Sequence, residues 1–500
     1  MSEEKKFVNY EDFGAVGDGV ADDIDAIIAA HAYANAHNLP VKTKPDATYY
    51  IGRRAKTAII QTDVDWNTSR FTIDDTDVED NKVPCFDVCS ALKPVEIKLD
   101  KLSRDQKQVD VHPETDCFVT VYNANVKHFI RYGLNPSPGT DATDCFVLRR
   151  DGSIYGPIDW DYDVITKVEA QPIDDKPLTL KGGVFTTMAN REESKYNYYQ
   201  RNIEIHRSNV IVDSITHYVA GEIGHGAPYR GFISAERCAF ITVQNCFATG
   251  HKIYVTIGRA NLPVSMGSYD LHANSVVDVT FRNCRINNIT DNTRWGVIAT
   301  NFCKNLLVED CIFSRLDAHQ GVSGTYTIRN SQMGWQGINA IGRGLLTLDN
   351  VTANGHSLIN FRGDYGSTWE GDIEIKNCRW IPSCGNEARP IMFNMANNGM
   401  HDFGYPCFMP ETITIDGLRV EDSNTPADYE GLTLFADPDG TSWGPQLPLK
   451  DVRPHPYTPC RKVTIHGLTC ASNKAVSKVC ENPEPFKDTE IMVNGRKFEA

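Results

Sequence analysis

The stretches "ITVQNC" (241–246), "VTFRNC" (279–284) and "LLVEDC" (306–311) decide the fold of this chain. Each alternates apolar and polar residues and then turns through Asn or Asp into a cysteine. Further copies, ending in a small or apolar residue, are "LTLKGG" (178–183), "YTIRNS" (326–331), "LTLDNV" (346–351), "IEIKNC" (373–378), "ITIDGL" (413–418) and "VTIHGL" (463–468). Because the alternation has period two and Val, Ile and Thr are frequent, the copies are predicted to be β-strands, and helical repeats are excluded.

The spacing of the copies predicts a solenoid. From Cys246 onward, their last residues stand 38, 27, 20, 20, 27, 40 and 50 positions apart. Such short spacings with variable insertions are typical of stacked coils that carry loops. Propeller blades need about 40 residues each, and the spaced leucines of a leucine-rich array are absent. We predict an all-β, right-handed parallel β-helix that stacks Cys246, Cys284, Cys311, Ser331, Val351 and Cys378 in one line.

The N-terminal part, residues 1–84, is predicted to hold a cap and the first coils. Its segment 11–38 combines a glycine-punctuated turn with apolar residues at helical spacing. The turn contains Gly14, Gly17 and Gly19, Asp22 or Asp23 is the expected cap, and the helical positions are Ile24, Ile27, Ile28 and His31. A helix here would cover the open end of the first coil, which otherwise exposes core and strand edges.

The remainder of the chain divides into two predicted parts. Residues 85–176 fit the repeats poorly and have strands and turns at hairpin spacing. We expect a β-rich insert or elaboration there, with a structural role favoured over carbohydrate binding or oligomer formation. Residues 177–500 are predicted to form the main β-helix with long loops.

The composition limits the partners and the compartment. A net charge of −15 disfavours nucleic acids and anionic membranes, because both need a basic face. The chain has no apolar run of about 18 residues and no signal-type N-terminal segment, so we expect a cytoplasmic protein, or a secreted one if a signal was removed. Its fifteen cysteines are then expected mostly as thiols, some forming a ladder in the core. Without a CxxC pair or a Cys/His cluster at zinc spacing, no metal and no cofactor is predicted.

Chemically capable residues recur on consecutive predicted coils. The stretch "SRLDAHQGV" (314–322) is the densest example, and the later coils repeat its character. Because coils stack in register, these side chains are expected to lie side by side on the outside. A wall of acids, amides, arginines and aromatic rings suits sugar recognition. The predicted binding residues are Glu222, His225, Trp295, Arg315, His319, Gln336, Asn360, Arg362, Trp369 and Asp402.

Hydrolysis of a glycosidic bond needs two carboxyl groups. Asp317 and Asp364 lie on predicted coils two apart, which separates them by ~9.6 Å along the axis at ~4.8 Å per coil. That value is at the upper end of the range of about 6.5–9.5 Å for inverting enzymes. Glu370 is a second candidate acid. The predicted catalytic residues are therefore Asp317, Asp364 and Glu370.

The segment "DFGAVGDGVADDIDAI" (12–27) resembles the N-terminal signature of the pectate-lyase-like right-handed β-helix superfamily. That superfamily includes polygalacturonase-type hydrolases, polysaccharide lyases, epimerases and phage tailspike depolymerases, so the resemblance implies the fold and a carbohydrate-related function. The polygalacturonase GHG motif has a counterpart in Gly224, His225 and Gly226. Its NTD, DD and RIK companions are missing, so the polygalacturonase catalytic residues are not transferred.

These observations predict a glycoside hydrolase that acts on an oligo- or polysaccharide. A lyase or epimerase is the first alternative, with Arg315, His319 or Arg362 as base and calcium as its cofactor. The acidic net charge disfavours the uronate polymers that such enzymes cleave. A non-catalytic, glycan-binding β-helix of the phage-tail type is the second alternative. A homo-oligomer, either a trimer or a dimer, fits both the enzyme and the binding protein.

Overall fold

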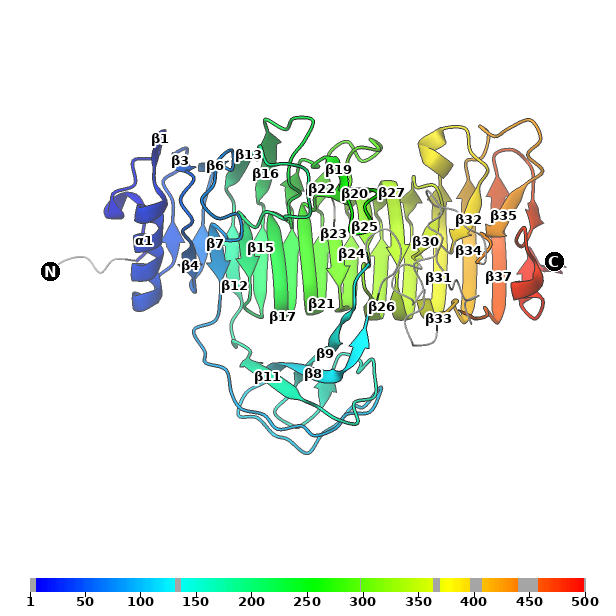
Figure 1. Cartoon of the computed structure of the whole chain (residues 1–500), viewed down its shortest axis with the longest axis horizontal. Coiled ribbons are helices and arrows are strands. Elements are labelled where there is room, and N and C mark those ends of the chain that lie inside the picture. The colour runs from blue at the N-terminus through cyan, green and yellow to red at the C-terminus, as the bar shows by residue number, and fades with distance from the viewer. Residues whose placement is uncertain are drawn as a thin grey trace.

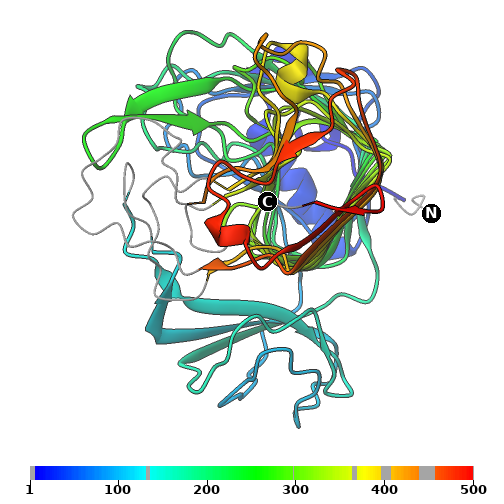
Figure 2. The same ribbon diagram turned by 90° about the vertical axis from the view of Figure 1, so that its right-hand side faces the viewer.

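A computed structural model describes residues 6–130, 136–296, 298–362, 369–395, 407–438 and 457–498. The predicted site residues Asp364 and Asp402 lie outside these ranges. The described chain winds into one long solenoid, with its strands stacked side by side from the N-terminal to the C-terminal end (Figure 1). In the view along the axis, the coils superpose around a common interior (Figure 2).

Three parallel ladders of strands form the walls of the solenoid. The first contains β2 (Val41–Lys42), β5 (Val64–Asp65), β12 (Leu178–Lys181), β15 (Val210–Asp213), β17 (Ile233–Gln244), β21 (Leu271–Arg282), β24 (Cys303–Glu309), β26 (Val322–Arg329), β28 (Gly342–Asp349), β31 (Trp369–Trp380), β34 (Thr412–Val420), β37 (Lys462–Cys470), β39 (Glu490–Val493) and the antiparallel β40 (Arg496–Lys497). The second contains β1 (Asp18–Asp22), β3 (Thr48–Ile51), β6 (Arg70–Asp74), β13 (Val184–Met188), β16 (Thr216–Ala220), β18 (Phe247–Ala248), β22 (Arg285–Ile286), β25 (Ile312–Asp317), β27 (Gln332–Ala340) and β29 (Thr352–Ala353).

The third ladder turns the chain back toward the first. It contains β4 (Ala58–Ile60), β7 (Phe86–Val88), β14 (Ile203–Ile205), β23 (Ile298–Asn301), β30 (Ile359–Phe361), β32 (Ile391–Asn394), β35 (Leu432–Phe435) and β38 (Val476–Lys478). The first residues of β17 and β21 and the last residues of β25 and β27 complete it. The predicted parallel β-helix is therefore confirmed.

The predicted line of anchor residues is confirmed by the strand register. The pairs Gln244–Arg282, Arg282–Glu309, Glu309–Arg329, Arg329–Asp349 and Asp349–Lys376 each stand two residues before consecutive anchors. The residue just before each anchor adopts a left-handed backbone conformation, with φ between 49° and 56° at Asn245, Asn283, Asp310, Asn330, Asn350 and Asn377. Asn and Asp tolerate this conformation better than other side chains except glycine, which explains the "N-C" and "D-C" pairs of the repeat.

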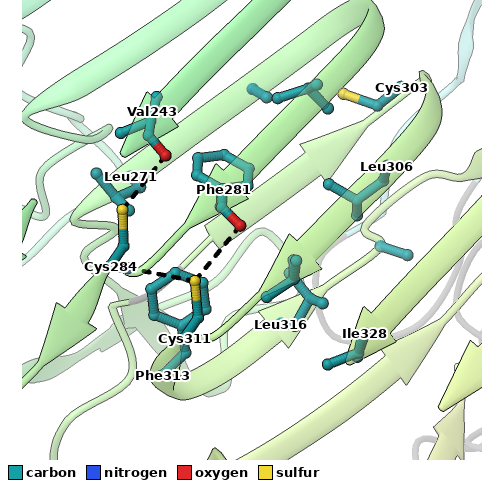
Figure 3. Close-up of a cluster of buried hydrophobic side chains, with 14 of the residues drawn as sticks. Val243, Leu271, Phe281, Cys284, Cys303, Leu306, Cys311, Phe313, Leu316 and Ile328 are labelled. Carbon is teal, nitrogen blue, oxygen red and sulfur yellow. Dashed lines mark hydrogen bonds between the residues drawn. The ribbon is translucent and has the colours of Figure 1, made fainter. Parts of the chain in front are cut away.

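The cysteines at the anchor positions lie inside the solenoid. Cys246, Cys284, Cys311 and Cys378 are each at most 4% exposed, and all fifteen cysteines of the chain are thiols. The Cys284 and Cys311 sulfurs lie close to backbone groups of neighbouring strands, next to Phe281 and Phe313 (Figure 3). Burial raises the pKa of Cys378 to about 11, so this thiol stays protonated and serves as core packing.

The predicted capping helix is present as α1 (Ile24–His37), which follows the short helix η1 (Glu11–Phe13). It covers the N-terminal end of the solenoid (Figure 1), and Ile24, Ile27 and His31 are buried. Asp23 occupies the cap position, but its side chain accepts no hydrogen bond from the helix, whereas Asp22 Oδ1 accepts one from the Ile24 amide at 3.2 Å. The Asp23 carboxylate instead accepts hydrogen bonds from the Val16 and Gly17 amides, so it fixes the glycine turn before the helix.

Between β7 and β12 the chain leaves the solenoid and forms a separate β-rich body. Its four-stranded antiparallel sheet has the order β10 (Ile154–Tyr155), β9 (Thr140–Leu148), β8 (Cys117–His128), β11 (Lys167–Pro172). We call residues 89–177 the insert. It lies against one side of the solenoid, beneath β17 to β26 in Figure 1. The insert has its own apolar core around Val119, Phe146 and Leu148.

The remaining elements are short. They are the hairpin β19 (Ile253–Ile257) and β20 (Pro263–Gly267), the pair β33 (Cys407–Phe408) and β36 (Tyr457–Thr458), and the short helices η2 (Pro382–Gly385) and η3 (Glu484–Phe486). None of the helices in the described ranges is long and apolar enough to cross a membrane.

Candidate functional site

A row of polar residues runs along the outside of the third ladder. Its members occupy one register position on successive coils: Asp87, Glu204, Ser234, His272, Asp317, Asn339, Asn360 and Asn394. Between His272 and Asp317 the same position is held by Ala299. Since strand side chains alternate, the neighbours Leu316, Ile338 and Ile359 point into the core and this polar row points out. A solenoid does not need acids, amides and imidazoles at such positions for stacking alone.

Asp317 lies at the centre of the polar row and carries two ion pairs. Arg315 Nη2 lies 2.8 Å from its Oδ2, and Arg362 Nη1 donates to both carboxylate oxygens, at 3.0 and 3.1 Å. The Asp317 side chain has no exposed surface. Burial alone would raise the pKa of Asp317, but the charges of Arg315 and Arg362 outweigh it and hold this pKa below its ordinary value. Asp317 is therefore ionised. In this state it can act as a base or a nucleophile or hold the two arginines in place, but it cannot donate a proton.

The surroundings of Asp317 combine an aromatic ring with amide groups. The Arg315 guanidinium lies over the Trp295 ring, 4.5 Å from its centroid. Along the row, Asn360 donates to Asn339 at 2.5 Å and Asn394 donates to Asn360 at 2.9 Å. The outer edge of this region, formed by Trp295, His319, Asn360 and Arg362, is half-buried and so reaches solvent. The structure thus brings together Trp295, Arg315, Asp317, His319, Asn360 and Arg362, as the sequence predicted.

Glu222 belongs to a second cluster that adjoins the first through Arg294 and Trp295. It accepts hydrogen bonds from the Lys252 amide at 3.1 Å, the Tyr254 hydroxyl at 3.2 Å and Arg294 Nη1 at 3.2 Å. Burial acts to raise the pKa of Glu222, but the contacts with His251, Lys252 and Arg294 lower it to about 2. Glu222 is therefore a fixed negative charge beside the polar row.

Four other predicted residues are not brought to Asp317. Glu370 lies on the first ladder and pairs with Arg104 of the insert at 2.5 Å. Trp369 is fully buried in the solenoid core, so its predicted role as a sugar-stacking surface is wrong: its side chain points inward at a strand position that alternates with Glu370. His225 is exposed and contacts the Glu192 carbonyl, and Gln336 donates to the Asn292 carbonyl.

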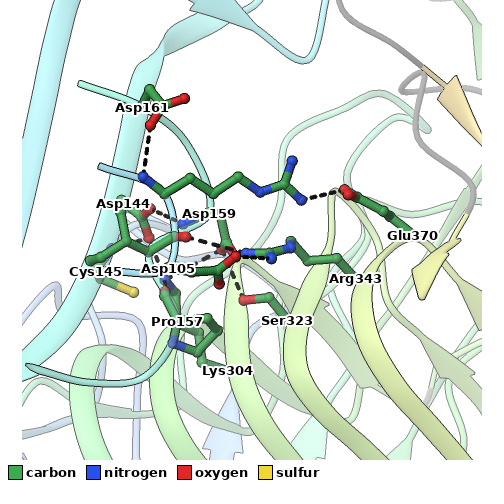
Figure 4. A network of polar contacts seen from close by, with 12 residues as sticks. Asp105, Asp144, Cys145, Pro157, Asp159, Asp161, Lys304, Ser323, Arg343 and Glu370 are labelled. Carbon is green, nitrogen blue, oxygen red and sulfur yellow. Dashed lines mark hydrogen bonds and ion pairs between the residues drawn. The ribbon is translucent and has the colours of Figure 1, made fainter. Parts of the chain in front are cut away.

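The Glu370 region is a polar interface between the insert and the solenoid (Figure 4). The buried Lys304 ammonium contacts Asp144 and the Pro157 carbonyl of the insert, and Asp159 lies 3.3 Å away. Beside these groups is a cavity of about 70 Å³ lined by insert and solenoid residues. Sequence reasoning missed this interface because its partners are far apart in the chain.

Sequence reasoning also missed His217, His251 and Asp270, three buried residues beside Glu222. They come from separate coils, at positions that form no short motif. His272 was missed for the same reason, although its place in the polar row follows from its position seven residues before the strand copy "VTFRNC".

Comparison with known proteins places the fold. No family model matches the chain. The tailspike gp61 of Pseudomonas phage phi297 is similar over 94% of this chain and 76% of its own, with a TM-score of 0.57 and 13% identity. The two proteins share the parallel β-helix fold. The predicted resemblance to the right-handed β-helix superfamily is thus confirmed for the fold.

Two further similarities are more distant or partial. The Gp54 tailspike of Acinetobacter baumannii bacteriophage AP22, solved with a capsular saccharide, has a TM-score of 0.49 and 10% identity, over 97% of this chain and 79% of its own. A capsule KL64-specific depolymerase of Klebsiella phage P510 is 31% identical over 121 residues. That match spans 22% of this chain and 12% of the depolymerase.

Proposed function

We propose that this chain is a glycan-degrading enzyme that binds an oligo- or polysaccharide along the polar row and hydrolyses it. The observation that carries the proposal is the ionised Asp317, held by Arg315 and Arg362 next to the Trp295 ring. Carboxylates, guanidinium groups and aromatic rings together are the groups that bind sugar hydroxyls and ring faces. The partial match to a capsule depolymerase supports a polysaccharide substrate.

In this proposal the residues of the row have separate roles. His319, Asn360 and Arg362 bind sugar hydroxyls at the half-buried edge. Asp317 is the ionised carboxylate of the mechanism and activates water; because its side chain has no exposed surface, direct attack on the sugar is not part of the proposal. Its pKa is too low for proton donation, so the acid must be a different residue. Asp364 is the proposed acid because it follows Arg362 by two positions in the sequence.

Leaving-group chemistry tests the two roles. An aryl glycoside can carry an activated leaving group that departs without protonation. Such a substrate therefore restores the activity of a variant that lacks only the catalytic acid. We expect Asp364→Asn to be rescued by such a substrate and Asp317→Asn to remain inactive on it. Rescue of Asp317→Asn, or no rescue of either variant, contradicts the proposed roles.

A lyase is the alternative that the same side chains favour, because Arg315, Arg362 and His319 are groups that lyases use toward a uronate. A lyase creates a C=C bond whose ultraviolet absorbance rises with each cleavage, whereas a hydrolase releases reducing ends without this absorbance. Incubation with a panel of bacterial capsular and exopolysaccharides, read by both signals, distinguishes the two. Degradation with rising absorbance would replace hydrolysis by elimination. The absence of either signal across the panel would favour a glycan-binding protein.

A further inference from the structure

Three buried side chains converge beside Glu222, at the edge of the polar row. His217 comes from β16, His251 follows β18, and Asp270 precedes β21. One ligand-type atom from each lies within 4.8 Å of the other two. All three residues are at most 3% exposed, so these groups meet away from bulk water.

The polar atoms of this cluster lack ordinary partners. Neither oxygen of Asp270 accepts a side-chain hydrogen bond from a described residue, and the His251 amide is only a weak backbone donor to this carboxylate. Its nearest charged neighbour is His251, whose Nε2 lies 3.9 Å from Asp270 Oδ1. His217 Nδ1 is likewise buried without a hydrogen-bond partner among the described residues. Leaving a carboxylate and an imidazole nitrogen unsatisfied in the interior is costly unless a cation or a proton joins them.

The outer contacts orient both imidazole rings toward the centre of the cluster. His217 Nε2 lies 2.9 Å from the Thr187 hydroxyl, which leaves Nδ1 as the nitrogen without a partner. His251 Nδ1 lies 3.5 Å from Glu222 Oε1, so its Nε2 is directed to Asp270. Metal-binding histidines characteristically engage a hydroxyl, carbonyl or carboxylate through the nitrogen that does not bind the metal.

The distances within the cluster are close to those of a metal site. His251 Nε2 lies 3.9 Å from Asp270 Oδ1, and the three ligand-type atoms lie within 4.8 Å of one another. To bind Zn²⁺ in tetrahedral geometry, the ligand atoms must approach to about 3.4 Å of one another, given Zn–N distances of about 2.0–2.1 Å. His251 Nε2 and Asp270 Oδ1 are therefore about 0.5 Å farther apart than in such a site.

We propose that His217, His251 and Asp270 bind one divalent transition-metal ion of the Zn²⁺ class. Two imidazoles and one carboxylate are ligands that Zn²⁺ accepts. The ion would join three coils of the solenoid next to Arg294 and Trp295. It would thereby hold the end of the polar row in place, as a structural metal and not as part of the proposed hydrolysis. This proposal departs from the expectation of no metal, which rested on sequence spacing alone.

Metal titration of the full chain tests this site independently of any glycan. The protein is stripped with a chelator and titrated with Zn²⁺ and with Co²⁺, whose visible absorption intensifies in a tetrahedral site with protein ligands. We expect one ion per chain, a Co²⁺ spectrum displaced by Zn²⁺, and a higher melting temperature in the presence of Zn²⁺.

Matched variants locate the ligands. Asp270→Asn and His251→Gln should each weaken binding by at least about tenfold. His206→Gln is the control, because His206 belongs to a separate group with Glu204 and Glu236, and it should bind like the wild type. If one ligand variant does not fold, the other still gives the answer. The proposal is overturned if the wild type binds no metal, because the three residues would then share a proton instead. It is also overturned if His206→Gln abolishes the Co²⁺ spectrum.

Discussion

At the scale of single residues, Asp317 is the most constrained group of the polar row. It is fully buried and is contacted by two guanidinium groups, of which Arg315 is 7% exposed and Arg362 is 15% exposed. Such a pair of contacts costs desolvation energy on formation, so its net contribution to stability is small. Removing only the Asp317 carboxylate has a larger effect on stability, because it leaves two guanidinium charges in a poorly solvated place.

We therefore expect Asp317→Asn to lower the free energy of unfolding by about 3–5 kcal/mol as well as to remove activity. The double variant Asp317→Asn/Arg362→Gln should regain part of the stability, since one of the two cations beside position 317 is gone, without regaining activity. Denaturant unfolding of the four proteins in the cycle measures the coupling. A single variant as stable as the wild type would show that Asp317 does not depend on its arginines.

The pH dependence of stability follows from the lowered pKa of Asp317. Because the folded-state pKa lies below the ordinary value of 3.8, ionised Asp317 stabilises the fold above pH 3.8 and loses this effect as the pH falls through the folded-state pKa. The stability difference between wild type and Asp317→Asn should be constant between about pH 7 and about pH 5 and shrink toward about pH 3. If the stability difference instead grew as the pH fell, the pKa of Asp317 would be raised by folding, which contradicts an ionised Asp317.

At the scale of elements, the turns and the insert interface show how far the sequence predicts structure. The turn before each anchor was predictable because local chemistry decides it: Asn tolerates the left-handed backbone at Asn330, where φ is 50°. The interface of Lys304 with Asp144 was not predictable, since 160 residues separate the partners. By contrast, the alternation that places Ile373 and Ile375 in the core also places Trp369 there when it is continued back two residues at a time, so the burial of Trp369 was predictable.

Substitutions at Asn330 test the turn. Asn330→Ala should cost about 1–2 kcal/mol, because Ala is strained at a positive φ, and Asn330→Gly should cost less. The Asn350 side chain donates to Asn330 at 3.0 Å, and both variants lose this contact, so the comparison isolates the backbone effect. Equal stabilities of the two variants, measured by thermal unfolding, would count against a strained turn.

Lys304 is expected to hold the insert against the solenoid. Lys304→Met leaves Asp144 without its buried cation and should cost about 3–5 kcal/mol of docking stability. The control Glu370→Gln removes the half-exposed contact with Arg104 and should cost about 1 kcal/mol or less. Amide hydrogen exchange in β8 and β9 measures the effect. Protection of these amides should fall in Lys304→Met and persist in Glu370→Gln. Unchanged exchange in Lys304→Met would mean that other contacts dock the insert.

At the scale of the whole molecule, repetition made the fold readable from the sequence. Each coil repeats one strand pattern, so the register of Cys246, Cys284 and Cys311 followed from counting residues. The site was only partly readable, because its members depend on where each coil turns. Asp317, Arg315 and Arg362 were found as a cluster, whereas Asp270 and His251 required the three-dimensional path. The cytoplasmic location and the oligomeric state stay predictions.

The central claim is that the outer edge of the polar row binds and cleaves a glycan. Its most direct test is the release of reducing ends from a susceptible capsular polysaccharide by three proteins: wild type, His319→Ala, and His466→Ala as the matched control on the exposed side of β37. We predict at least about a tenfold loss of kcat/KM for His319→Ala, in a variant that stays folded at the assay temperature, and wild-type activity for His466→Ala. Full activity of His319→Ala, or an equal loss in both variants, would contradict the account.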